Sequence, residues 1–325
     1  MNFVKHCLLN GGIIKPLLID HKDLCGPAIC NPSVAVFDDN IIVNLRNVNY
    51  TLYHAEKNIF EHYWGPLVYM NPEDDAHLRT TNYIAKLDDD LDIVKYTKID
   101  TSKFDTYEPQ WDFVGLEDGR LIRWNNKIYL IGVRRDVDTK GTGRMELSEL
   151  EFNKFGVKEV SRYRVPGELP DNEYCMKNCT PVEGMPYKLM KWTNPTVLMD
   201  CSKPETVFEQ QNDKMTGDGY ADFRGGSQVI EYGDGYLTII HETRLEKSRQ
   251  GRKNGKYRHR FVYWDENFQF KKVSKLFSFL DTRVEFCCGL ARYHDDLLIT
   301  FAATDNAAFI LKVSRKVVEE YINEQ

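Results

Sequence analysis

Residues 31–46 read NPSVAVFDDNIIVNLR, and the pattern in this segment decides the fold. A polar start is followed by an apolar run, an Asp-Asp-Asn turn, a second apolar run and a polar end. Short runs of β-branched and aromatic residues that are divided by Asp, Asn or Gly are typical of two strands joined by a tight turn. The segment therefore predicts a β-hairpin.

The same pattern recurs along the chain. It is found as DGRLIRWNNKIYLIGVR at 118–134, GSQVIEYGDGYLTIIH at 226–241, CGLARYHDDLLITFAATD at 288–305 and, less closely, KNCTPVEGMPYKLMKW at 177–192. In chain order the five segments start 87, 59, 49 and 62 residues apart. This spacing is close to the roughly 40 to 50 residues of a four-stranded blade plus loop insertions. Five such units predict a five-bladed β-propeller.

The remaining apolar segments are consistent with this architecture. Residues 81–86 turn through an Asp-Asp-Asp sequence into 93–96, and residues 145–152 lead into 157–165, so both pairs are expected to be outer strands. Helical periodicity is clear only at 314–323. The expected fold class is thus all-β with a short C-terminal helix, and the alternative is a β-sandwich or two small β domains.

The ends and the domain count follow from the same pattern. No linker rich in Pro, Gly or Ser interrupts residues 1–325, so a single domain is expected. The residues before Asn31 are expected to form either a strand that closes the ring or a loose arm.

Composition excludes several classes of protein. The 325 residues are 42% hydrophobic and 12% aromatic, which excludes a disordered chain. A formal net charge of -6 gives no overall attraction to nucleic acid or to an anionic membrane. Eight scattered cysteines without metal-ligand spacing, and an N-terminus with only short apolar runs, favour reduced thiols, no metal, no membrane segment and a cytoplasmic location.

Equivalent positions of the repeats are expected to meet in space. The innermost strand of each propeller blade lines a central channel, so the polar ends of these strands gather at one mouth. The gathered residues are Asn31, Asp118, Lys177 and Gly226 at strand starts, with Arg46, Arg134, His241 and Asp305 at strand ends. An amide, two carboxylates and several nitrogen donors suit a hydroxyl-rich substrate with an anionic partner.

These motifs resemble the inner-strand motifs of glycoside hydrolase family 130. They are Asn31-Pro32-Ser33 with Arg46, Gly115-Leu116-Glu117-Asp118-Gly119-Arg120, Gly225-Gly226 running to His241, and Cys288-Gly289 running to Ala303-Thr304-Asp305. The resemblance spans residues 28–313. It implies a five-bladed propeller and, for most members, an inverting phosphorylase of β-mannosides. The family has Pro where this chain has Gly119.

The resemblance also implies residue roles. Asp118 matches the proton donor, Asn31, Arg46 and Asp305 match sugar-binding positions, and Lys177 and His241 match phosphate-binding positions. A further phosphate-binding Arg is implied, and Arg134, Arg135 or Arg144 would supply it. Each residue also has a structural alternative: a turn for Asp118, surface ion pairs for Lys177 and Arg46, a core imidazole for His241, and a cap or turn for Asp305.

The chemistry of an inverting phosphorylase fits this set. Phosphate itself attacks the anomeric carbon, so one protein carboxylic acid and a group of cations suffice. An inverting hydrolase needs a second carboxylate to activate water. As the acid, Asp118 is expected to have a raised pKa from burial or from neighbouring Glu117. No cofactor is expected beyond inorganic phosphate or a sugar phosphate as co-substrate.

A basic run from Arg244 to Arg260 is a separate feature. It contains eight Lys or Arg residues against the single acid Glu246 and is expected to form a long hairpin beside His241. This run is the one feature that could contact a phosphorylated substrate, a sugar nucleotide or nucleic acid, although most such runs are solvated surface. Arg244 is assigned to the anion site.

The leading hypothesis is a carbohydrate-active enzyme that transfers a mannosyl-like group with inversion, in the manner of a glycoside phosphorylase. The first alternative is a glycosyltransferase on the same fold that uses an activated sugar donor, which the basic run and Gly119 favour. The second is a propeller without catalytic activity that binds a glycan or a protein.

Overall fold

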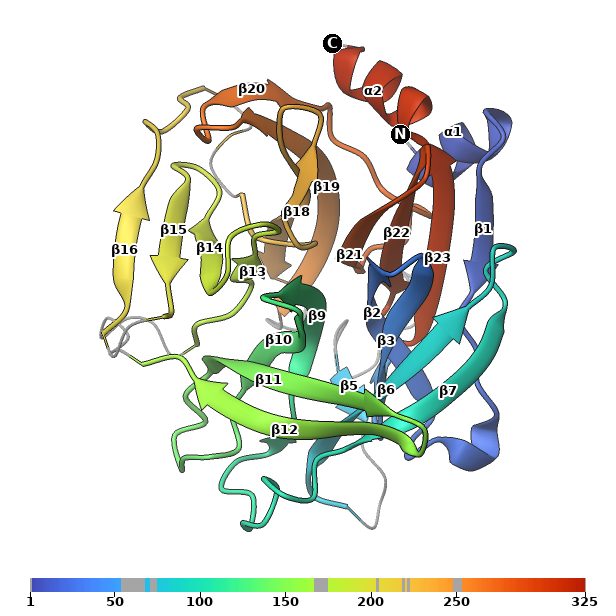
Figure 1. Ribbon diagram of the computed structural model, residues 1–325, viewed down its shortest axis with the longest axis vertical. Helices are drawn as coiled ribbons and strands as arrows, with labels where there is room; N and C mark the ends of the chain where they lie inside the picture. The colour runs from blue at the N-terminus through green and yellow to red at the C-terminus, as the bar shows by residue number, and fades with distance from the viewer. Residues whose placement is uncertain are drawn as a thin grey trace.

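The computed structural model describes residues 2–53, 68–70, 75–166, 175–202, 205–217, 220, 223–247 and 253–324. Within these residues, the strands form five blades of four strands that radiate from a common axis (Figure 1). The all-β, five-bladed propeller predicted from the repeats is therefore confirmed.

The blades follow one another along the chain. Blade 1 contains β2 (Ala28–Phe37), β3 (Asn40–Val48), β6 (Leu78–Leu87) and β7 (Ile93–Asp100), and blade 2 contains β9 (Glu117–Trp124), β10 (Lys127–Arg134), β11 (Arg144–Asn153) and β12 (Gly156–Arg164). Blade 3 contains β13 (Thr180–Pro181), β14 (Lys188–Trp192), β15 (Val197–Asp200) and β16 (Val207–Gln210). Blade 4 contains β17 (Ile230–Tyr232), β18 (Gly235–Lys247), β19 (Lys253–Asp265) and β20 (Phe270–Val273). Blade 5 contains β21 (Glu285–Tyr293), β22 (Asp296–Ala303), β23 (Ala307–Ser314) and β1 (Ile13–Pro16).

The repeated hairpins are the two inner strands of each blade. Their turns need residues that tolerate positive φ, because only mirror-image turns match the twist of the strands they join. Asp38 and Asp39 have φ of 50° and 60°, and Asn125 and Asn126 have φ of 49° and 59°. Asp and Asn adopt this conformation more easily than other side chains, which explains the composition of the turns.

The N-terminal strand closes the ring. β1 pairs with β23, so the first strand of the chain is the outermost strand of the last blade. The structure thus confirms the first of the two alternatives for the N-terminal segment.

Two terminal helices cover the joint between blades 4 and 5. The predicted C-terminal helix is α2 (Arg315–Asn323), and its Tyr321 packs edge-on against Phe3 with ring centroids 5.0 Å apart. Phe3 belongs to α1 (Phe3–Leu9), which was not predicted. Seven residues are too few to display helical periodicity, and the helix depends on tertiary contacts with an aromatic cluster.

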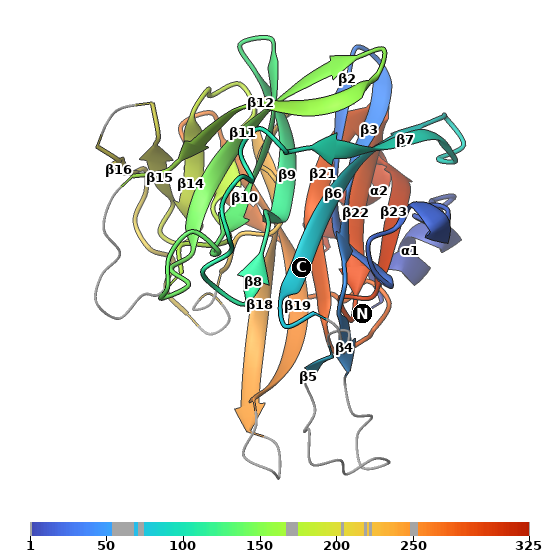
Figure 2. The ribbon, with the colours of Figure 1, turned by 90° about the horizontal axis from the view of Figure 1, so that it is seen from below.

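Two hairpins extend beyond the ring on the same face of the molecule. They are the short pair β4 (Thr51–Tyr53) and β5 (Val68–Met70) and the long ends of β18 and β19 (Figure 2). The remaining elements are η1 (His21–Asp23) and β8 (Phe113–Val114), which pairs with β6.

A glutamine at the axis ties three blades together. The Gln228 side chain, 2% exposed, donates to the carbonyl oxygens of Val34 (2.6 Å) and Leu121 (3.3 Å) and accepts from the Leu290 amide (3.1 Å). These partners belong to β2, β9 and β21, which are the inner strands of three different blades. One side chain therefore fixes the spacing of those strands at the axis.

Replacing this side chain tests its role. Gln228→Leu leaves two buried carbonyl groups and one buried amide without partners, so we expect the free energy of unfolding to fall by about 2–3 kcal/mol. Chemical denaturation measures the change. Gln110→Leu is the matched control, since Gln110 is exposed and its replacement should change stability by less than about 0.5 kcal/mol. Equal effects of the two substitutions would contradict the role given to Gln228.

Candidate active site

A polar cavity of about 130 Å³ lies where the five blades meet, and two of its residues, His241 and Tyr257, belong to the long strands β18 and β19. It is lined by Asn31, Arg46, Tyr50, Phe113, Glu117, Asp118, Lys177, Asn178, Arg224, His241, Tyr257, Val284, Phe286 and Asp305. These residues come from all five blades or their connections. Six of them are predicted site residues: Asn31, Arg46, Asp118, Lys177, His241 and Asp305.

Local backbone geometry directs the polar side chains into the cavity. Asn31, Asp118, Asn178 and Asp305 all have positive φ, between 42° and 62°. The pairing register shifts beside Asn31 and in the strand opposite Asp118, as expected for β-bulges. A bulge changes the direction in which a strand residue points, and such positions are common next to active sites. Asn31 and Asp118, the polar residues at two of the strand starts, therefore lie at these irregularities.

Arg46 connects the carboxylates on one side of the cavity. It is 4% exposed and donates from Nη1 to Asp118 Oδ1 (2.7 Å) and from Nη2 to Glu117 Oε2 (3.3 Å). Arg46 Nη2 also donates to the Tyr50 hydroxyl (2.8 Å), and Asn31 Nδ2 donates to Asp118 Oδ1 (2.7 Å). Without this guanidinium, two adjacent carboxylates in a poorly solvated site would repel each other.

These contacts decide the ionisation of Asp118. Burial alone would raise the pKa of Asp118, but the charges of Arg46 and Arg120 and the hydrogen bond from Asn31 outweigh it and lower the pKa below its ordinary value. The raised pKa expected for Asp118 is therefore not found. The sequence reasoning considered Glu117 as a neighbour and did not pair Asp118 with Arg46.

The pKa values of the other two carboxyl groups of the cavity shift in the opposite direction, upward. Burial raises the pKa of Asp305 to about 6, with Arg46 opposing the rise and the negative charge of Asp118 adding to it. Burial also raises the pKa of Glu117. The cavity therefore combines an ionised Asp118 with a carboxyl group, Asp305, that titrates near neutral pH, and such a separation of pKa values is typical of acid and base pairs.

Nitrogen donors and a phenol form the other part of the cavity. Lys177 and Arg224 are close enough to His241 and Tyr257 to perturb the pKa values of both. The His241 ring stacks on Tyr257 with centroids 5.6 Å apart. Burial, together with the nearby charge of Arg224, lowers the pKa of His241 well below its ordinary value, so the imidazole is neutral at pH 7.

Three buried polar atoms on the cavity wall have no hydrogen-bond partner among the described residues. They are Asn31 Oδ1, Glu117 Oε1 and His241 Nδ1. Buried polar atoms are nearly always hydrogen-bonded, and unpaired ones indicate a missing water or ligand. Three of them around one cavity mark it as a site for a polar ligand.

Comparison with solved structures identifies the same fold. A β-1,2-mannobiose phosphorylase from Listeria innocua matches over 96% of this chain and 97% of its own, with a TM-score of 0.54 and 13% identity. A mannose phosphorylase from Leishmania mexicana in complex with a phosphate ion matches over 98% of this chain and 94% of its own, with a TM-score of 0.50 and 10% identity.

A third structure carries the family description. It belongs to glycoside hydrolase family 130, described as a family of mannoside phosphorylases that contains hydrolases of β-1,2-mannosidic linkages in Candida mannan. It matches over 94% of both chains, with a TM-score of 0.56 and 12% identity. The fold resembles that of family 130. At this identity the likeness shows the fold alone, and no protein-family model and no curated protein matches the sequence.

Four arginines assigned to phosphate from the sequence do not line the cavity. Arg134 is buried against Glu146 (2.8 Å) and lines a different cavity. Arg144 is its strand neighbour on β11. Arg135 donates to the carbonyl oxygen of Gly141 (3.0 Å) and lies over the Phe113 ring, behind the cavity wall. Arg244 lies on the extended part of β18 and is exposed.

The structure instead brings Arg224 into the cavity, and the sequence reasoning missed it. Arg224 pairs with His241 through two backbone hydrogen bonds (3.0 and 2.9 Å), although the two residues lie 17 positions apart. The following Gly225 lets the same segment pass close to Asn178, because a Cβ there would lie 2.0 Å from the carbonyl oxygen of Asn178. The position of an Arg directly before the Gly225-Gly226 motif is the signal that could have identified it.

The basic run is partly neutralised by the protein itself. Arg258 pairs with Asp281 (3.3 Å) and Arg260 with Glu242 (2.6 Å). The side chains of residues 245–254 lie outside the described part of the structure. Arg244 and Lys256, on either side of them, are exposed. The run therefore presents less positive charge than its composition indicates.

Two further searches concern metals and membranes. Among the described residues, no group of three or more His, Cys, Asp or Glu side chains is arranged to hold a metal ion. In the same part of the chain, neither helix has the length and apolar character needed to cross a bilayer.

The pKa of Asp305 predicts a pH-dependent effect on stability. Since its pKa rises from 3.8 to about 6 on folding, the folded state binds the proton more tightly, and ionisation destabilises the fold as pH rises through this range. Asp305→Asn removes that ionisation. Urea denaturation measures the free energy of unfolding of the variant minus that of the native protein. We expect this difference to be more favourable to the variant at about pH 7.5 than at about pH 4.

The control for this measurement is Asp90→Asn, at an exposed turn. Its stability relative to the native protein should be the same at both pH values. An Asp305→Asn difference that does not change with pH would contradict the environment described for Asp305.

Proposed function

We propose that this cavity transfers a mannose-like glycosyl group between a saccharide and phosphate, with inversion at the anomeric carbon. The observation that carries the proposal is the composition of one small cavity. Carboxylates lie with Arg46 in one part of it, and Lys177 and Arg224 lie with a neutral His241 in another part. A sugar with several hydroxyl groups and an anion are the two ligands that such a pair of surfaces would bind.

The carboxylate part of the cavity suits the sugar. Asn31 Oδ1 and Glu117 Oε1 are buried acceptors without partners among the described residues, and sugar hydroxyl groups are donors. Arg46 holds Asp118 in place with a 2.7 Å bond. In the proposal, Asn31, Arg46 and Asp305 bind the sugar, and Asp118 faces the bond that breaks.

The nitrogen-rich part suits the phosphate. Lys177 and Arg224 supply positive charge, and the neutral His241 and the Tyr257 hydroxyl supply single hydrogen bonds. Charge-assisted bonds to phosphate are short and strong, particularly from guanidinium groups. The role expected for Lys177 and His241 therefore extends to Arg224, while Arg134, Arg135, Arg144 and Arg244 have no direct part in it.

The proposed reaction needs one proton transfer. A phosphate oxygen forms a bond to the anomeric carbon, the bond from that carbon to the leaving oxygen breaks, and the leaving oxygen takes a proton. Hydrogen phosphate loses a proton when it becomes the sugar 1-phosphate, so no net proton is consumed. Asp118 is the proposed donor. Bound phosphate would add a nearby negative charge, which raises the pKa of Asp118 from its low value.

A glycosyltransferase is the second candidate, and one observation favours it. The extended ends of β18 and β19 begin at two cavity residues, His241 and Tyr257, and carry the exposed cations Arg244 and Lys256 beyond the mouth. Such a hairpin would suit the diphosphate of a sugar nucleotide. A propeller that only binds glycans is the remaining alternative.

Incubation with sugar 1-phosphates distinguishes these functions. We expect phosphate release from α-mannose 1-phosphate in the presence of mannose or manno-oligosaccharide acceptors. Asp118→Asn should lower kcat by about 10²- to 10⁴-fold, the usual contribution of a general acid. Lys177→Ala should raise the KM for phosphate in the reverse reaction by about tenfold or more, since it removes a charge-assisted bond.

The matched controls are Asp90→Asn and Lys127→Ala, both at exposed positions, which should leave the kinetics unchanged. If a β-mannoside is hydrolysed at a rate that does not depend on phosphate, the reaction is hydrolysis and not phosphorolysis. Thermal stabilisation by a nucleotide sugar and none by phosphate would favour the transferase. If Asp118→Asn does not change ligand binding and no donor is turned over, the remaining function is that of a propeller that only binds glycans.

A further inference from the structure

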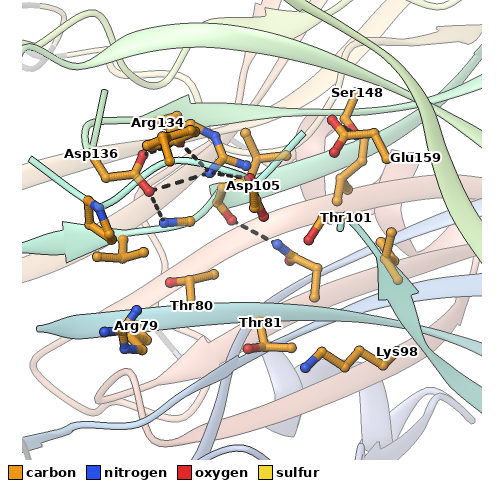
Figure 3. Close-up of a pocket in the computed structure, with 18 residues that line it drawn as sticks. Arg79, Thr80, Thr81, Lys98, Thr101, Asp105, Arg134, Asp136, Ser148 and Glu159 are labelled. Carbon is orange, nitrogen blue, oxygen red and sulfur yellow. Dashed lines mark hydrogen bonds and ion pairs between the residues drawn. The ribbon is translucent and has the colours of Figure 1, made fainter. Parts of the chain in front are cut away.

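A second cavity lies between blades 1 and 2, outside the proposed active site. It has a volume of about 300 Å³, at the lower end of the range of small-molecule sites. Figure 3 shows Thr80, Thr81 and Lys98 on one side of it and Arg134 and Ser148 on the other. The first group comes from β6 and β7, and the second from β10 and β11.

Pairing of the outer strands closes this cavity at its edge. β7 and β12 form a short parallel ladder in which Ile99 lies opposite Val157 and Asp100 opposite Lys158. Among the described strands, this ladder is the one place where two blades share hydrogen bonds between their outer strands. The two blades therefore form one continuous sheet that folds around the cavity, which makes the space a fixed feature of the fold.

The buried charges around this cavity neutralise one another. Arg134 donates to Glu146 (2.8 Å) and lies 3.5 Å from Asp136, and both partners are less than 3% exposed. Glu159 accepts from Ser148 (2.7 Å) and from Arg162 (2.6 Å). Two exposed cations, Arg79 and Lys98, also line the cavity, and Arg79 pairs with Asp75 (2.7 Å). The buried charges are thus compensated within the protein and leave no buried ion to bind a phosphate or a metal ion.

The remaining lining offers hydroxyl groups above an apolar floor. Thr81 and Thr101 present hydroxyl groups, and the paired carboxylates keep lone pairs available as acceptors. Leu116 and Leu130 form the apolar floor and are almost fully buried. Uncharged donors and acceptors over an apolar surface match a neutral polyhydroxylated ring, which has hydroxyl groups at its edge and C–H groups on its faces.

This cavity and the proposed active site share a wall. Along the segment 113–118, Phe113, Glu117 and Asp118 line the active-site cavity, whereas residues 114–116 line the second cavity. A hydrogen bond also crosses the wall, because Arg46 Nε donates to the hydroxyl group of Thr80 (3.2 Å), which lines the second cavity. A ligand in the second cavity would therefore contact the residues that support Arg46.

We propose that the cavity between blades 1 and 2 is a second binding site for a neutral monosaccharide or a polyol of similar size. It is separate from the catalytic cavity and does not depend on which reaction that cavity performs. The buried ions are paired with one another and so do not favour an anion, the hydroxyl groups and carboxylates bind the hydroxyl groups of the ligand, and Leu116 and Leu130 contact its apolar face.

Calorimetric titration of the protein with D-mannose tests this site. Thr81→Phe fills the space between the blades, so we expect the affinity for the sugar to fall by about tenfold or more, a loss of at least about 1.4 kcal/mol. Thr81→Val keeps the shape of the side chain, removes the hydroxyl group, and should weaken binding by a smaller factor. Thr97→Phe is the matched control, since Thr97 lies on the neighbouring strand β7 and does not line the cavity.

A crystal soaked with D-mannose locates the bound sugar. Sugar density between blades 1 and 2, lost in Thr81→Phe, supports the proposal. Four results overturn it: no binding heat, equal affinity of the native protein and Thr81→Phe, sugar found in the catalytic cavity alone, or phosphate bound between the blades. Thermal unfolding of each variant confirms folding, and loss of Asp118-dependent turnover would not affect this outcome.

Discussion

The convergence of five inner strands at one axis is the constraint on which the rest of the structure depends. Four of these strands are fixed to one another by side chains as well as by packing. Gln228 bonds to β2, β9 and β21, and Arg120 of β9 donates to the carbonyl oxygen of Gly226 (2.7 Å), just before β17. Arg120 also donates to the carbonyl oxygen of Asp118 (2.7 Å). The same contacts that hold the blades together therefore hold the backbone of the candidate acid.

A narrow polar axis has an electrostatic consequence. Carboxylates presented by several blades meet in a space with little solvent, where their charges repel and each ionisation is opposed by burial. The protein resolves this conflict by placing Arg46 among them, so that Asp118 ionises while Asp305 retains its proton up to a pH of about 6. The two aspartates differ because Asp118 also accepts a hydrogen bond from Asn31 and lies near the charge of Arg120, whereas burial dominates at Asp305.

The sequence predicted the features that repeat and failed on the features that occur once. Five similar segments were enough for the propeller and for six residues of the cavity, because a repeated position has the same location in every blade. Arg224 and the helix α1 were missed, since neither belongs to the repeated pattern. Arg134 was misplaced for a physical reason: it does occupy the end of an inner hairpin, but its partners Glu146 and Asp136 hold it in a neighbouring cavity. The low pKa of Asp118 could not be predicted from the sequence either, because it depends on a contact between residues 72 positions apart.

One segment explains why two polar cavities lie side by side. Phe113, Glu117 and Asp118 line the cavity at the axis, and the residues between them, 114–116, line the space between blades 1 and 2. Towards the axis the set is charged and incompletely paired, as a site for chemistry requires. Towards the blade interface, the charges of Arg134 and Glu159 are fully paired within the protein. A space with paired buried charges and hydroxyl groups can hold a neutral molecule without stabilising an ionic transition state, so the two cavities differ in kind although one segment forms the wall of both.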